Sequence, residues 1–193
     1  MVYIMKPYVI TTDITSDLPE SYIKEHNIGV IPIYYSLNGS IYGDDIKQDP
    51  KSFYDIMRSG AMPTTMAANP DAVKKLFSRL LDDGYDILHI AFSSALSGSC
   101  SVAEATAIEI CEERPDAKIV VVDSLCASMG EGLLVHKAVE LKEKGKSIDE
   151  LKDWLENNKL NICHMFTVDD LHHLQRGGRV SKTSAIIGSF LNV

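Results

Sequence analysis

Short runs of β-branched and apolar residues alternate with segments of helical polarity along most of this chain. Strands are predicted for residues 8–12, 28–37, 86–92, 117–124 and 161–168. Helices are predicted for residues 19–27, 51–60, 71–84, 101–113, 133–144 and 148–158. Strands that alternate with helices of this length form right-handed parallel sheets with helices on both faces. The sequence therefore predicts an α/β protein built in three layers.

Three local signals indicate where particular elements begin. The Asn-Gly pair at 38–39 is a preferred two-residue hairpin turn, so a β-hairpin is predicted there. Ser101 with Glu104, and Ser147 with Glu150, have the spacing of a capping box, in which the two side chains satisfy free backbone N–H groups. We therefore expect helices to begin at these two serines.

Charge and hydropathy exclude several classes of function. The 19 Lys and Arg residues against 27 Asp and Glu residues give a net charge of −8, which repels phosphate backbones and argues against nucleic-acid partners. The apolar runs are shorter than the ~20 residues of a membrane span, so no integral membrane insertion is expected. With 45% hydrophobic residues, a chain of 193 residues can bury a stable core without disulfide bonds or bound metals.

The cysteines indicate the compartment. Cys100, Cys111, Cys126 and Cys163 are widely spaced and form no C-x-x-C pair, which is typical of reduced thiols in a cytosolic protein. The N-terminus has no secretory hydrophobic region, because Pro7 interrupts its apolar run. A cytoplasmic protein is expected.

Hydroxyl and acidic side chains follow three of the predicted strands, in the segments TTDITSD (11–17), FSSALSGS (92–99) and VVDSLCAS (121–128). The carboxyl ends of parallel strands meet at one edge of the sheet, where ligands bind in such folds. Serine hydroxyls and free N–H groups at a helix start make a small anion site. They can also serve only as helix caps. A serine nucleophile is disfavoured because the turn lacks the G-x-S-x-G pattern.

The C-terminal region carries histidines, acids and arginines. A metal site there is disfavoured, because adjacent histidines point to different faces of a helix and at most one could join a tetrahedral set. The residues concerned are His164, Asp169, Asp170, His172 and His173. In the segment RGGR (176–179), the glycines allow a tight turn that can present two guanidinium groups to a carboxylate or phosphate. A basic turn without a ligand is the alternative.

Five segments together resemble the DegV family of lipid-binding proteins. In chain order they are TDITSDLP, PTTMAANP, SSALSGS, VVDS with the later GEG, and LHHLQRGGRVS. Ile14, Met66 and Ala67 depart from the family pattern, so the hydrogen bonding of the PTTMAANP loop beyond Thr65 is open. The chain stops at GSFLNV, where the family continues. The resemblance therefore implies a first domain at 1–160 and the beginning of a second α/β domain at 161–193.

The resemblance also implies a function. Members bind a long-chain fatty acid and serve as acyl-carrier subunits of a bacterial fatty acid kinase, with no cofactor and no catalysis alone. The acyl carboxylate would be held by Thr65 and by Ser93 or Ser94. Arg176 would support this network, while Arg179 would assist phosphoryl transfer with the kinase. Alternatives are a small-molecule enzyme acting on a short carboxylate or phosphate at the same rim, and a purely regulatory lipid-binding module.

Overall fold

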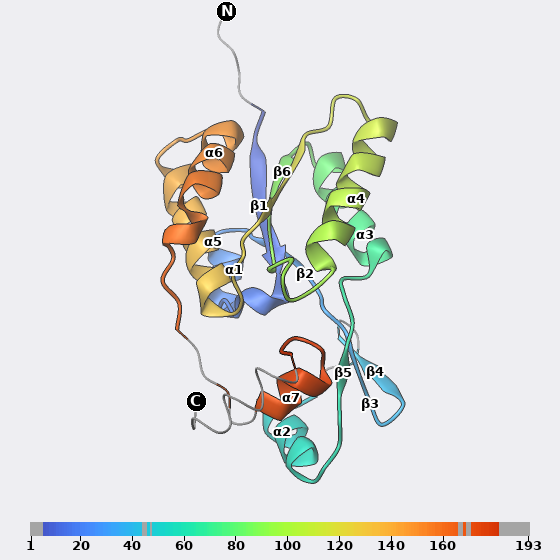
Figure 1. The fold of residues 1–193 in the computed structure, drawn as a ribbon. Coiled ribbons are helices and arrows are strands. Elements are labelled where there is room, and N and C mark those ends of the chain that lie inside the picture. Colours follow the sequence, from blue (N-terminus) through green and yellow to red (C-terminus); the bar gives the residue numbers. More distant parts are fainter. Residues whose placement is uncertain (1–5, 44–45, 47, 166–167, 169–170, 182–193) are drawn as a thin grey trace, which may run out of the picture. The chain divides into compact units, whose positions relative to one another are not determined.

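The computed structural model describes residues 6–43, 46, 48–165, 168 and 171–181 (Figure 1). The chain divides into two units, residues 1–163 and 164–193, and each is treated by itself below. In the described part of the chain, no helix has the length and apolar character needed to cross a membrane.

The first unit is built on a parallel sheet. Its strands are β2 (Gly29–Ile31), β1 (Tyr8–Asp13), β6 (Asp86–Ala91) and β7 (Ile119–Asp123), in that spatial order, and every neighbouring pair is parallel. The parallel arrangement follows from the helices that connect successive strands, because each crossover brings the chain back to the same end of the sheet.

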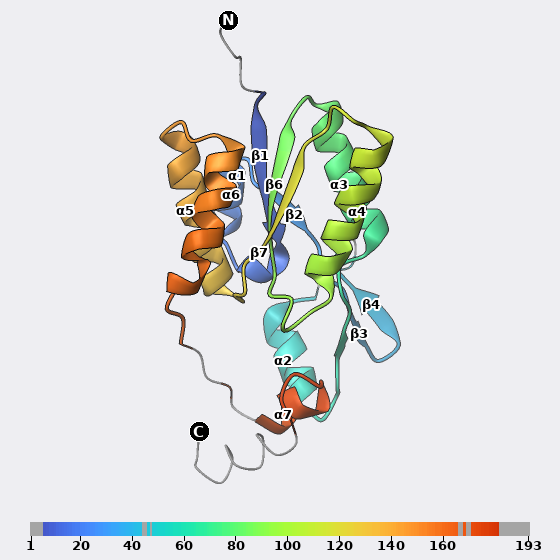
Figure 2. The ribbon, with the colours of Figure 1, turned by 45° about the horizontal axis from the view of Figure 1, so that its top comes forward.

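Helices cover both faces of this sheet, as Figures 1 and 2 show from two directions. The helices α1 (Glu20–Glu25), α5 (Met129–Glu143) and α6 (Ile148–Asn158) lie on one face. The helices α3 (Pro70–Asp82) and α4 (Ser99–Glu113) lie on the other. The predicted three-layer α/β architecture is confirmed.

Two hydrophobic cores result, one on each side of the sheet. In β6, Leu88 and Ile90 pack with α5 and α6, while Ile87 packs with α3 and α4, because successive side chains of a strand point to opposite faces. Every residue of β6 is buried. A strand buried on both faces reads as a nearly continuous apolar run, and four of the six residues of β6 are apolar, which explains why the sequence predicts this strand.

A small antiparallel sheet and one helix follow β2. The strands are β4 (Ser40–Tyr42), β3 (Tyr35–Leu37) and β5 (Thr64–Thr65), in that order, and α2 spans Pro50–Arg58. The turn between β3 and β4 has φ of 51° at Asn38 and 82° at Gly39, as a type I′ turn requires, which confirms the predicted hairpin. In Figures 1 and 2 this small sheet lies beyond the carboxyl ends of the parallel strands.

The single strand predicted for residues 28–37 is wrong. The strand β2 ends at Ile31, and β3 begins at Tyr35 in a different sheet. Pro32 explains the break, because proline has no N–H for the ladder of hydrogen bonds between strands. A short 3₁₀ helix, η1 (Ile14–Ser16), directly follows β1.

Two further element predictions are corrected and one is confirmed. The helix α4 begins at Ser99 rather than Ser101, because Ser97 Oγ already accepts the Ser99 N–H at 3.2 Å. The Ser147 capping box is present at the start of α6. The strand predicted for 161–168 is not seen where it is described: residues 159–161 form a 3₁₀ helix, η2 (Lys159–Asn161), and 162–165 are irregular, while 166–167 lie outside the described residues.

Candidate functional site

The ends of three parallel strands are tied together at one edge of the sheet. The Phe92 N–H, just after β6, donates to Asp13 Oδ2 at the end of β1, with an N···O distance of 2.7 Å. The Ser94 N–H donates to Asp123 Oδ1 at the end of β7, at 3.1 Å. The Ser93 N–H donates to the Cys126 carbonyl at 3.0 Å. The polar rim predicted from the three segments is therefore present, and its backbone is held by acidic side chains.

The two adjacent serines at this rim differ in exposure. Ser93 is only 3% exposed, and its Oγ accepts the Ala95 N–H at 3.3 Å. Ser94 is exposed. Ser94 is therefore the more accessible of the two serines, whereas the Ser93 hydroxyl is enclosed and engaged within the turn.

The loop that carries Thr65 is fastened to the start of α4. Thr65 is exposed at the end of β5, and the Met66 N–H donates to the Tyr34 carbonyl at 3.0 Å. The Ala68 N–H donates to Ser99 Oγ at 3.0 Å. The loop thus keeps a backbone hydrogen bond at Met66, which departs from the family pattern, and another at Ala68, so Thr65 is presented from an anchored segment.

A histidine is buried below this rim, in β6. His89 is fully buried, and its Nδ1 lies 3.0 Å from Thr11 Oγ1 on the neighbouring strand. Its Nε2 lies 3.9 Å from Asp13 Oδ2 and has no hydrogen-bond partner among the described residues. Burial lowers the pKa of His89, so the ring is neutral at pH 7. This buried, unpartnered nitrogen was not anticipated from the sequence.

A glutamic acid at the start of α5 is buried against β1. Glu131, in the first turn of α5, is 0% exposed, with Oε1 2.9 Å from Thr12 Oγ1 and Oε2 3.0 Å from Thr15 Oγ1. Burial raises its pKa from 4.5 to about 8, and the Asp13 carboxylate adds to the rise. Sequence reasoning assigned Glu131 no role. The signal available was an acid between two glycines at the expected start of a helix.

The two arginines lie in the second unit. The helix α7 (Leu171–Arg176) ends in a turn with Gly178 at φ 76°, and the Arg179 N–H donates to the Leu174 carbonyl at 3.0 Å. Arg176 and Arg179 are exposed within this unit, on either side of the glycine pair. The predicted tight turn is confirmed. Because this unit is described by itself, the roles of the two arginines at the rim stay predictions.

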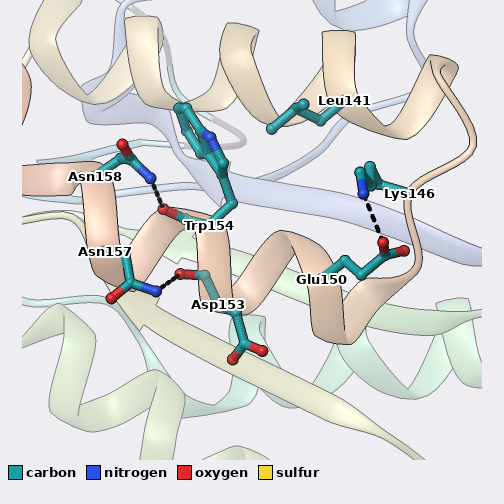
Figure 3. Close-up of a pocket in the computed structure, with 7 residues that line it drawn as sticks. All are labelled: Leu141, Lys146, Glu150, Asp153, Trp154, Asn157 and Asn158. Atoms are coloured by element: carbon teal, nitrogen blue, oxygen red, sulfur yellow. Dashed lines mark hydrogen bonds and ion pairs between the residues drawn. The ribbon is translucent and has the colours of Figure 1, made fainter.

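A groove of about 320 Å³ between α5 and α6 is a poor candidate for a ligand site (Figure 3). Lys146 Nζ is paired with Glu150 Oε1 at 2.6 Å, so these two charges in the groove neutralise each other. The Asn158 side chain donates to the Trp154 carbonyl at 2.7 Å within the same helix. Polar groups that are satisfied locally leave little to recognise a ligand. Within the described ranges, no group of His, Cys, Asp or Glu is arranged to hold a metal ion.

The cysteines give a first prediction. Burial raises the pKa of Cys100 to about 12, while Cys163 is exposed. Because only the thiolate is nucleophilic, iodoacetamide at pH 8 is expected to label Cys163 first and Cys100 last. Peptide mapping by mass spectrometry gives the order, and the intact mass before labelling should correspond to four free thiols. Labelling of Cys100 as fast as Cys163 would contradict the buried position.

A parallel sheet with an accessible hydroxyl rim beyond its carboxyl edge defines an α/β protein suited to binding a small anionic group.

The comparisons identify the family. The DegV family model, described as that of an uncharacterised protein, matches residues 7–193, and the chain belongs to this family. A DegV domain-containing protein of Clostridium perfringens is 44% identical over 191 residues, which cover 98% of this chain and 66% of the relative.

Two solved structures share the fold. A fatty-acid-binding DegV family protein from Thermus thermophilus is 33% identical, with a TM-score of 0.84 over 97% of this chain and 65% of that one. A fatty acid (stearic acid)-binding protein from Eubacterium ventriosum is 25% identical, with a TM-score of 0.82 over 94% of this chain and 63% of that one. This chain therefore spans about two thirds of the length of these relatives.

Proposed function

We propose that this protein binds a long-chain fatty acid and presents the acyl carboxylate to a separate ATP-dependent fatty acid kinase. The accessible Ser94 hydroxyl carries the proposal, since it lies at the rim of a fold whose solved relatives bind fatty acids. Thr65 supplies a second hydroxyl from the loop fastened to α4. A carboxylate accepts hydrogen bonds from both, and such charge-assisted bonds are the stronger kind.

The protein would supply binding and orientation only. In the transfer, a carboxylate oxygen attacks the γ-phosphorus of ATP, the bond to the bridging oxygen breaks, and ADP leaves as acyl phosphate forms. Nucleotide and metal come from the kinase. Arg176 supports the carboxylate network, and Arg179 offsets the charge that develops on the transferred group. The scattered, unpaired cysteines support a cytoplasmic location for this protein.

Lipid retention tests the binding function directly. Native mass spectrometry and chloroform extraction of the purified protein should show a long acyl chain bound in about equimolar amount. Protein that carries no lipid, and takes up none when incubated with stearate, would contradict fatty acid binding. A short carboxylate or phosphate retained instead would favour the alternative of a small-molecule enzyme at the same rim. Lipid bound without any kinase-dependent turnover would favour a regulatory module.

The arginines separate binding from transfer. Arg179→Ala should retain its fatty acid yet lose most kinase-dependent acyl phosphate formation, because a cation that stabilises developing charge acts only in the transition state. Arg176→Ala should weaken lipid retention as well. The measurements are acyl phosphate production with the cognate kinase and ATP, and lipid content by extraction. Turnover of Arg179→Ala at the unchanged rate would show that the transfer role is wrong.

A further inference from the structure

The environment of Glu131 restricts it to a single arrangement. Its side chain is sealed from solvent, between Thr12 on β1 and Thr15 on η1. The next residue, Gly132, sits so close to η1 that an added Cβ would lie 2.6 Å from the Ser16 carbonyl oxygen. The first turn of α5 is therefore seated directly on η1, and the Glu131 carboxyl group is buried at this contact.

The hydrogen bonds around Thr12 can accommodate a protonated Glu131. Thr12 Oγ1 is 2.9 Å from the Ile90 carbonyl oxygen and 2.9 Å from Glu131 Oε1. A hydroxyl has one proton to donate, and a carbonyl oxygen can only accept. If Thr12 donates to Ile90, the contact with Glu131 is a hydrogen bond only when the carboxyl group carries the proton. Glu131 Oε2 then accepts from Thr15, so these hydrogen-bonding groups all have partners. The Asp13 N–H also donates to Glu131; such hydrogen bonds lower its pKa, but burial outweighs them.

The charges around Glu131 favour the same state. Asp13 on β1 is the acidic neighbour that raises its pKa, and Asp17 follows η1. Cys126, in the loop after β7, is a buried thiol whose own pKa is raised by burial and by Glu131. His89 on β6 lies beside Asp13 and is neutral at pH 7. Among the ion pairs of the described residues, none gives Glu131 a cationic partner.

We propose that Glu131 is a positioning residue that acts as a neutral acid: it locks the end of β1 to α5 and keeps a further negative charge, beyond those of Asp13 and Asp123, away from the acyl-carboxylate site. The link to the site is Asp13, whose carboxylate holds the Phe92 N–H directly before Ser93 and Ser94. This inference rests on the proposed function. An anionic ligand bound at this rim would be repelled by an ionised Glu131, whereas a protonated one leaves the site able to accept it.

The proposal predicts an alkaline loss of affinity that depends on one residue. Burial and Asp13 raise the pKa of Glu131 to about 8, so it ionises as the pH rises beyond that value. Stearate affinity should be steady from pH 6.5 to 7.5 and fall roughly fivefold by pH 9.5, since two like charges near a protein interior repel appreciably. In Glu131→Gln the amide can donate to Thr12 and accept from Thr15, so affinity at pH 7 should be retained without the alkaline fall.

The experiment compares the wild-type protein, Glu131→Gln and the exposed control Glu112→Gln by stearate titration over this pH range. The control should follow the wild type, which also corrects for changes in stearate itself. A wild-type profile parallel to that of Glu131→Gln, or loss of affinity in Glu131→Gln at pH 7 despite a folded protein, would overturn the proposal.

Infrared difference spectroscopy tests the proton without any ligand. The wild-type protein at pH 7 should show the carbonyl stretch of a protonated carboxylic acid that is absent from Glu131→Gln and disappears above pH 8. Its absence in the wild type at pH 7 overturns the neutral state even if the variant does not fold well. Failure of all three proteins to bind stearate at any pH would instead overturn the proposed function, and the infrared band would still decide the protonation of Glu131.

Discussion

Glu131→Gln is expected to raise the free energy of unfolding by about 3 kcal/mol at pH 7 and by roughly 5 kcal/mol above pH 8. The pKa of Glu131 is about 8 in the folded protein against 4.5 ordinarily, so the folded state binds more protons between these values. The free energy of unfolding of the wild type therefore falls by about 1.4 kcal/mol per pH unit as the pH rises through this window. Above the window it is level. An amide needs no proton and escapes this loss.

The measurement is urea unfolding of both proteins from pH 4 to pH 9, with Glu112→Gln as the matched control. The difference between wild type and Glu131→Gln should be near zero at pH 4 and reach a plateau above pH 8. Subtracting the two curves removes the contributions of other titrating groups, such as His89 at lower pH. A difference that is constant over the whole range would show that folding does not raise the pKa of Glu131.

The double substitution Thr65→Ala with Ser94→Ala is expected to lower acyl affinity by about 2–4 kcal/mol, or roughly 30- to 1,000-fold. Two hydrogen bonds to a charged group contribute about 1.5–3 kcal/mol each and are not additive. Both side chains are exposed, so removing their hydroxyls should leave the fold intact. Stearate titration and lipid content after purification give the result.

Neighbouring exposed hydroxyls provide the control for the double substitution. Thr64→Ala with Ser101→Ala removes the same two groups from the preceding residue of β5 and from the outer side of α4, and should leave affinity unchanged. Equal affinity of both double variants would show that Thr65 and Ser94 do not hold the carboxylate. Ser93→Ala, tested alone, then examines the enclosed serine.

The three-layer fold was predictable because its signals are local. The β6 strand is apolar apart from Asp86 and His89, and the Ser147 capping box and the Asn-Gly hairpin depend on residues a few positions apart. The errors arose where a competing local group decided the outcome. Pro32 divides what reads as one strand. Ser97 Oγ accepts the Ser99 N–H, so α4 begins before Ser101.

The candidate site was predictable in part. Hydroxyl-rich segments after three strands were enough to place a polar rim, because parallel strands end at the same edge. Which serine is accessible was not predictable, since it depends on how the turn packs against Cys126. A buried acid such as Glu131 looks in the sequence like any solvated helix residue. Only the distances to Thr12 and Thr15 reveal it.

The pairing of β1 with β6 also sets the order of events when the chain is made. The two strands meet through residues 78 positions apart, such as Thr11 and His89, so β1 is synthesised well before β6. At roughly 5–20 residues per second, several seconds separate the emergence of the two from the ribosome. During that interval the apolar β1 has only the three-residue β2 as a neighbour. The edge of β1 that pairs with β6 therefore stays open to pairing with other chains until residue 91 has left the exit tunnel.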